Sequence, residues 1–343
     1  MSFISLSKKH LLPLTVILCS FTIGSCHQQA ENRHTKNHST TSSVQVPLQK
    51  VDTTAYLEKI KSLANGDTSG LWPVKHQPFP LAGAILPFKR IVAFYGNLYS
   101  KKMGILGELP PKELWQKLDS EVQAWEKADP STPVQPAIHY IAVVGQGIPL
   151  KSGNYSMRMP FKQIDSVLTI AKMGHAIVFL DIQVGHSIVE KEVPLLEKYL
   201  MMPQVNLAID PEFSMKDGSI PGRKIGSLDA NDINYCSNYL AQLVQKYHLP
   251  PKILIIHRFT QGMVKNYKEI VLRPEVQIVM NMDGWGEPSL KMNTYKQYIY
   301  RQPVQFTGFK LFYKNDLKKP PHRMLTPEEL LKLKPQPVYI QYQ

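Results

Sequence analysis

Four acidic side chains follow short, strongly apolar runs, and their spacing permits acid–base chemistry. Asp181 ends the run IVFLD, Asp283 ends VQIVMNMD, and Asp210 and Glu212 come directly after VNLAI. Residues two apart on a strand share a face, so Asp210 and Glu212 would sit together with their backbones about 6.5 Å apart. Carboxyl groups this close raise one another's pKa, and one of them can then be protonated near neutral pH. The spacing predicts a general acid in this pair, with Asp181 or Asp283 as an ionised partner.

Polar and aromatic side chains occupy similar positions after other apolar runs. We expect a substrate-binding surface formed by Tyr95, Gln146, Gln183, His257 and Trp285. Gln183 lies two residues after Asp181, so both would point to the same face of a strand. Trp285 lies between two glycines. If the runs are parallel strands, their carboxyl ends meet at one edge and these side chains converge there.

Eight such runs alternate with helical patterns. The predicted strands are residues 90–98, 139–147, 176–185, 205–213, 252–260, 276–286, 305–315 and 337–343. The predicted helices are residues 110–127, 161–172, 189–201, 229–247, 263–271, 288–300 and 326–333. Strands that stay apolar until their last residues are typical of parallel sheets covered on both faces.

This alternation predicts an α/β protein with a (β/α)8 TIM-like barrel as its single domain. An open doubly wound sheet is the alternative, but the first strand ends in Tyr95-Gly96-Asn97-Leu98, without the glycine spacing of a phosphate-binding loop. We assign the barrel to residues 56–343, with residues 56–89 as an N-terminal extension over its floor or outer wall.

The Asp210-x-Glu212 element at the end of the fourth predicted strand resembles the acidic motif of barrel glycoside hydrolases, particularly lysozyme-like and chitinase-like members. The resemblance implies that Glu212 protonates the leaving oxygen while Asp210 tunes it, and that Asp181 or Asp283 activates water or stabilises the developing cation. It also implies that Trp285 and Tyr95 stack on sugars. The first strand lacks the terminal acid of the lysozyme-like family, and the seventh lacks a glutamate nucleophile. The expected function is hydrolysis of an envelope or environmental polysaccharide.

Two other functions remain open at this level. A non-catalytic lipoprotein that binds glycan or assists envelope assembly would need no converging acids. A metal-dependent phosphodiesterase would need Mg²⁺ or Ca²⁺, which carboxylates at Asp181, Asp210 and Glu212 could bind. The hydrolase hypothesis requires no cofactor or metal. Whether the protein is an enzyme depends on the convergence of these acids.

The N-terminus resembles a bacterial lipoprotein signal. Lys8 and Lys9 precede an apolar stretch that is too short to span a bilayer, and the stretch ends in Ile23-Gly24-Ser25-Cys26, which resembles a lipobox. This implies cleavage of residues 1–25 and a membrane anchor, with palmitate among its acyl groups, on Cys26. The polar residues 26–55 are expected to form a flexible tether. His27 after the cysteine favours the outer membrane over the inner one.

The remaining composition limits the partners. The formal charge is +13, and a basic surface outside the cytoplasm favours polysaccharide or anionic envelope components over nucleic acid. A solubilising surface without a specific partner is the alternative. Without the signal peptide and with Cys26 acylated, Cys236 is the remaining cysteine, so no disulfide framework is expected. Cys236 lies in a helical pattern and is expected to be a buried apolar residue.

Overall fold

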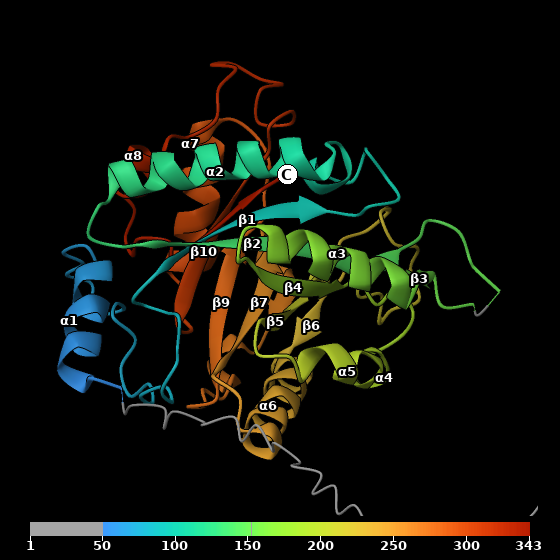
Figure 1. The fold of residues 1–343 in the computed structure, drawn as a ribbon, viewed down its shortest axis with the longest axis horizontal. Coiled ribbons are helices and arrows are strands. Elements are labelled where there is room, and N and C mark those ends of the chain that lie inside the picture. Colours follow the sequence, from blue (N-terminus) through green and yellow to red (C-terminus); the bar gives the residue numbers. More distant parts are fainter. Residues whose placement is uncertain (1–50, 152) are drawn as a thin grey trace, which may run out of the picture. The chain divides into compact units, whose positions relative to one another are not determined.

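The computed structural model describes residues 51–151 and 153–343 (Figure 1). The expected signal peptide, Cys26 and nearly all of the expected tether lie outside these residues. The folded chain starts slightly before the expected boundary at residue 56, because helix α1 spans Thr53–Leu63 and the Asp52 side chain caps it. Within the described part, no helix combines the length and apolarity needed to cross a bilayer.

Parallel strands in the described residues close into an eight-stranded barrel. They are β1 Arg90–Gly96, β2 Val134–Gly145, β4 Ile177–Ile182, β5 Val205–Ile209, β7 Lys252–Arg258, β9 Val276–Met282, β10 Phe306–Leu311 and β11 Tyr339–Tyr342. The ring closes because β1 pairs in parallel with both β11 and β2. This confirms the predicted barrel, with one strand for each predicted run, and the closure excludes an open doubly wound sheet.

Helices surround this barrel in the order that the alternation predicts. They are α2 Pro111–Ala128, α3 Phe161–Met173, α4 Val189–Glu192, α5 Glu197–Leu200, α6 Ala230–Tyr247, α7 Pro288–Thr294 and α8 Pro327–Leu330. A π-helical turn, Tyr295–Tyr300, extends α7. The proline at the start of α2 and the Thr326 cap of α8 match the signals in the sequence. Cys236 is a free, buried residue of α6.

Two predicted helices are wrong in detail. Residues 263–271 form no α-helix: a short strand, β8 Val264–Lys265, pairs with β6 Leu228–Asp229, and Asn266 then adopts a left-handed conformation at φ 55°. Residues 189–201 form two single turns, because Pro194 starts a 3₁₀ turn between α4 and α5. The short antiparallel strand β3 Ser156–Arg158 beside β2 was not predicted.

Side chains alternate along each strand between two apolar layers. Inside the barrel, Ile91 and Ala93 of β1 join a cluster that also includes Tyr56, Ile60 and Leu86. The N-terminal extension therefore covers the amino ends of the strands. The alternate residues pack outward against the helices in a second cluster. Because the amino end is covered by apolar side chains, the polar groups inside the barrel lie toward its carboxyl end.

The capping box of α6 gives a stability prediction. The Asp229 carboxylate accepts hydrogen bonds from the backbone N–H groups of Asn231 and Asp232, at 2.9 and 3.3 Å. We expect Asp229→Ala to lower the free energy of unfolding by about 1 kcal/mol, the usual cost of losing such a cap. Chemical denaturation measures this value. Asn231→Ala, at an exposed position of the same turn, is the control, and an equal loss in both variants would contradict the role of the cap.

Candidate active site

A cavity of about 710 Å³ opens at the carboxyl ends of the barrel strands. This is the face on which barrel enzymes carry their functional groups. Of the predicted site residues, the lining includes Tyr95, Gln146, Gln183, Asp210, Glu212, Asp283 and Trp285. Asp181 and His257 are absent from this lining, and both side chains are fully buried. The structure therefore separates the predicted site into a cavity wall and a deeper group inside the barrel.

Asp210 and Glu212 lie in a 3₁₀ turn that follows β5. The Asp210 carboxylate accepts a hydrogen bond from the backbone N–H of Glu212 at 3.1 Å and one from the Gln183 amide at 3.1 Å. The carbonyl oxygen of that amide in turn accepts a hydrogen bond from the backbone N–H of Gly145 at 3.0 Å. Both oxygens of Asp210 are thus engaged, while the half-buried Glu212 keeps its carboxyl group toward the cavity.

Both carboxyl groups of this pair are easier to protonate than in water. Burial, with repulsion from Asp283, raises the pKa of Glu212 to about 7. Burial also raises the pKa of Asp210 well above its usual value, and the neighbouring Glu212 charge adds to this. Because both shifts are upward, the pair holds a proton near neutral pH, and Glu212 is the more accessible member.

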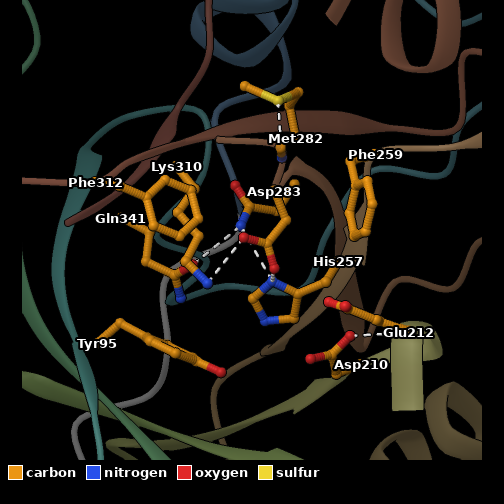
Figure 2. A network of polar contacts seen from close by, with 12 residues as sticks. Tyr95, Asp210, Glu212, His257, Phe259, Met282, Asp283, Lys310, Phe312 and Gln341 are labelled. Atoms are coloured by element: carbon orange, nitrogen blue, oxygen red, sulfur yellow. Dashed lines mark hydrogen bonds and ion pairs between the residues drawn. The ribbon is translucent and has the colours of Figure 1, made fainter. Parts of the chain in front are cut away.

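Asp283, after β9, has the opposite environment. Its carboxylate lies 2.8 Å from Lys310 Nζ and 2.9 Å from His257 Nδ1. Burial alone would raise the pKa of Asp283, but the charges of Lys310 and His257 lower it overall. In Figure 2, Asp283 and Lys310 lie on one side of His257, and Asp210 and Glu212 lie on the other. The cavity therefore combines a carboxyl group whose pKa is lowered with two whose pKa values are raised.

Asp181 is the deeper acid. One of its oxygens lies 3.5 Å from Nε2 of His139 and 3.5 Å from Nε2 of His257. The hydroxyl of Tyr95 donates a hydrogen bond to the same oxygen at 3.2 Å. Burial opposes ionisation of Asp181, but the His257 charge helps to lower its pKa overall. The contacts of Asp181 are with other side chains of the protein, and it does not lie on the cavity wall.

The two histidines of this group differ. The charges of Asp283 and Asp181 overcome the effect of burial and raise the pKa of His257 to about 10. Burial lowers the pKa of His139 to about 4. His139 Nδ1 lies 2.6 Å from the hydroxyl of Tyr339, inside the barrel. His139 was not predicted as a site residue, although the two-residue repeat of β2 places its side chain inside the barrel.

The two predicted aromatic platforms lie in different surroundings. Lys310 Nζ lies 3.8 Å from the centre of the Tyr95 ring, and Tyr95 is almost fully buried. Trp285 is 49% exposed, and Lys318 lies over its ring at 5.2 Å. Trp285 therefore offers accessible aromatic surface at the cavity rim, whereas the Tyr95 ring is buried against Lys310.

Asp316 fixes the loop that carries Trp285, and it too was missed. Its carboxylate accepts hydrogen bonds from the backbone N–H groups of Gly286 and Phe312, both at 3.0 Å, and from Lys291 Nζ at 2.5 Å. The contacts join the loop after β9 to the end of β10 and to α7. The sequence shows polar residues at the end of the seventh predicted strand, but it does not show which groups Asp316 contacts.

The Mg²⁺ or Ca²⁺ site expected at Asp181, Asp210 and Glu212 stays a prediction, and a different set of residues comes together as possible metal ligands. Among residues 51–151 and 153–343, the group whose ligand atoms all lie within 4.8 Å of one another is His139, Asp181 and His257. Asp210 and Glu212 do not join it. Two imidazoles and one carboxylate also differ from the all-oxygen sets that those ions prefer.

Comparison with known proteins shows a likeness in fold to solved structures. No protein-family model matches the chain, and no curated protein sequence matches it. The chain is similar in structure to a ruminal GH26 endo-β-1,4-mannanase, with a TM-score of 0.34 and 10% sequence identity. The likeness covers 74% of this chain and 58% of that enzyme. The barrel assignment rests on the closed strand order described above.

The raised pKa of Glu212 predicts a pH-dependent stability change. The folded-state pKa of about 7 lies above the ordinary value of 4.5. Ionising Glu212 therefore lowers the free energy of unfolding as the pH rises from about 4.5 through about 7. We expect Glu212→Gln to match the wild-type Tm at about pH 5 and to exceed it at about pH 8. Thermal unfolding at both pH values tests this, and an equal difference at the two would contradict the shift.

Proposed function

We propose that the protein is a glycoside hydrolase that cleaves an envelope or environmental polysaccharide by carboxylate acid–base catalysis. The observation that carries the proposal is that Glu212 and Asp283 line the same cavity in opposite environments, since burial raises the pKa of Glu212 to about 7 while Lys310 and His257 lower the pKa of Asp283. Glycosidic cleavage needs an acid to protonate the leaving oxygen and a second carboxylate with a different protonation state.

Each role follows from the local environment. Glu212 donates its proton to the leaving oxygen. Asp210, held by Gln183 and by the backbone of Glu212, keeps the pair singly protonated and fixes the turn. Asp283 supplies the negative charge that stabilises the developing cation or accepts a proton from water. Asp181 is excluded from direct contact because it is fully buried beneath the wall.

Saccharide binding is supported by the rim of the cavity. Trp285 presents an exposed aromatic face, and Gln146 lies on the cavity wall with part of its side chain accessible. Lys102 and Lys310 also contribute to the lining and give it cationic groups. An aromatic face with polar and cationic neighbours suits a sugar that carries carboxylate or other anionic groups.

The test is a screen of the full-length chain for release of reducing sugars from peptidoglycan, chitin and acidic polysaccharides. Release that disappears in Glu212→Gln, with folding retained, supports the proposal. Binding of a polysaccharide without release would overturn it in favour of a glycan-binding protein. Cleavage of a phosphodiester substrate that requires Mg²⁺, with no sugar release, would overturn it in favour of a phosphodiesterase.

We also infer that Cys26 anchors the protein to a bacterial membrane, the outer membrane being the expected one. The support is the apolar stretch followed by Ile23-Gly24-Ser25-Cys26 in the sequence. Labelled palmitate supplied during growth should enter the wild-type chain and not Cys26→Ser, and membrane fractionation should follow the label. A wild-type chain without label would contradict the inference.

A further inference from the structure

Beneath the cavity wall, three buried atoms of neighbouring side chains have no hydrogen-bond partner. They are Nε2 of His139, Nε2 of His257 and Oδ1 of Asp181, and the three side chains are fully buried. A buried polar atom without a partner costs free energy, commonly about 1–3 kcal/mol. Three such atoms in one cluster call for a specific explanation.

The distances in this cluster suit metal ligands better than hydrogen bonds. Each imidazole Nε2 lies 3.5 Å from Oδ2 of Asp181. An N–H donor and a carboxylate oxygen normally lie about 2.7–3.0 Å apart. In a tetrahedral zinc site with bonds of about 2.0–2.2 Å, two ligand atoms lie roughly 3.3–3.6 Å apart.

The far nitrogens of both imidazoles are already engaged. His257 Nδ1 lies 2.9 Å from the Asp283 carboxylate, and His139 Nδ1 lies 2.6 Å from the Tyr339 hydroxyl. A metal-binding histidine usually has such an outer partner, which fixes its orientation and leaves the other nitrogen's lone pair for the ion.

We propose that His139, Asp181 and His257 bind a zinc ion inside the barrel, beneath the cavity wall. Imidazole and carboxylate together suit zinc, whereas magnesium and calcium prefer oxygen ligands. The Tyr95 hydroxyl, 3.2 Å from Oδ2 of Asp181, lies beside the three ligands. Through His257, the ion would orient Asp283 on the cavity wall. The site does not depend on the proposed hydrolase activity, because its ligands lie outside the cavity lining.

The first test measures the metal directly in the full-length chain. Purified protein should retain close to equimolar zinc by elemental analysis after dialysis. Chelation should lower its Tm, zinc should restore it, and magnesium should not. Cobalt added to the chelated protein should give the strong visible absorption of a tetrahedral site. A Tm that neither chelation nor zinc changes would overturn the proposal without requiring any variant to fold.

Ligand variants locate the ion. His257→Gln and Asp181→Asn should weaken zinc binding by about 100-fold or more, since loss of even an outer partner costs about 10- to 100-fold. His186→Gln, at a half-buried histidine outside the cluster, should leave binding unchanged. The chain also carries His27, His34 and His38 near its N-terminus. Zinc content equal in wild type and His257→Gln would assign the metal to such other histidines and overturn the proposed site.

Discussion

Glu212→Gln is expected to lower kcat on the polysaccharide substrate by about 10²- to 10⁴-fold, the usual contribution of a positioned general acid. Glutamine has nearly the same shape but carries no transferable proton. The cavity and the turn around Asp210 should survive, because the backbone N–H of residue 212 makes the hydrogen bond to Asp210. Steady-state kinetics on the substrate found by the screen measures the effect.

The control for this variant is Glu190→Gln. Glu190 is exposed on α4 and does not line the cavity. Its substitution should change kcat by less than about twofold, in line with the small effects of most surface substitutions. Wild-type activity should also fall tenfold for each pH unit above about pH 7, because Glu212 loses its proton there. Similar losses in Glu190→Gln and Glu212→Gln would contradict the assignment of the acid.

Asp283→Asn is expected to reduce both activity and stability. It removes the ionised carboxylate from the cavity and leaves Lys310 and His257 without their closest counter-charge. Breaking one side of a buried ion pair costs about 3–5 kcal/mol of unfolding free energy. Loss of the stabilising charge should lower kcat by about 10²- to 10³-fold. Chemical denaturation and steady-state kinetics give the two values separately.

A double variant separates these effects. Asp283→Asn with Lys310→Met removes both partners, so it should recover part of the lost stability but none of the activity. Asp217→Asn, in an exposed ion pair with Lys224, is the matched control and should change neither by much. Recovery of activity in the double variant would show that Asp283 matters only as a partner of Lys310.

The barrel could be predicted because its signals are local. Strands buried on both faces stay apolar along their length, and β4 and β7 stand out for this reason. Helix starts were predicted where proline or a capping side chain marks them, as at α2 and α8. The segment at 263–271 failed because the pairing of β8 with β6 and the left-handed Asn266 depend on tertiary contacts.

The candidate site could be predicted only in part. Asp210 and Glu212 both line the cavity as predicted, but they do so from the 3₁₀ turn after β5 and not through the two-residue repeat of a strand. The sequence does not show how deep inside the barrel a side chain lies. Asp181 and His257 were therefore predicted to line the cavity, although they lie beneath it. Lys310 was not predicted as a site residue. The resemblance to hydrolases leads one to expect a glutamate on the seventh strand, whereas the residue of that strand that lines the cavity is a lysine.

The most direct test of the central claim is the dependence of Glu212→Gln activity on the leaving group. Two glycosides of the sugar found by the screen are compared, one with a strongly acidic phenol and one with an ordinary sugar alcohol as leaving group. Because the phenol departs without protonation, the variant should cleave the first within about tenfold of wild type and the second about 10²- to 10⁴-fold more slowly. Equal losses on both substrates would contradict the role of Glu212 as the general acid.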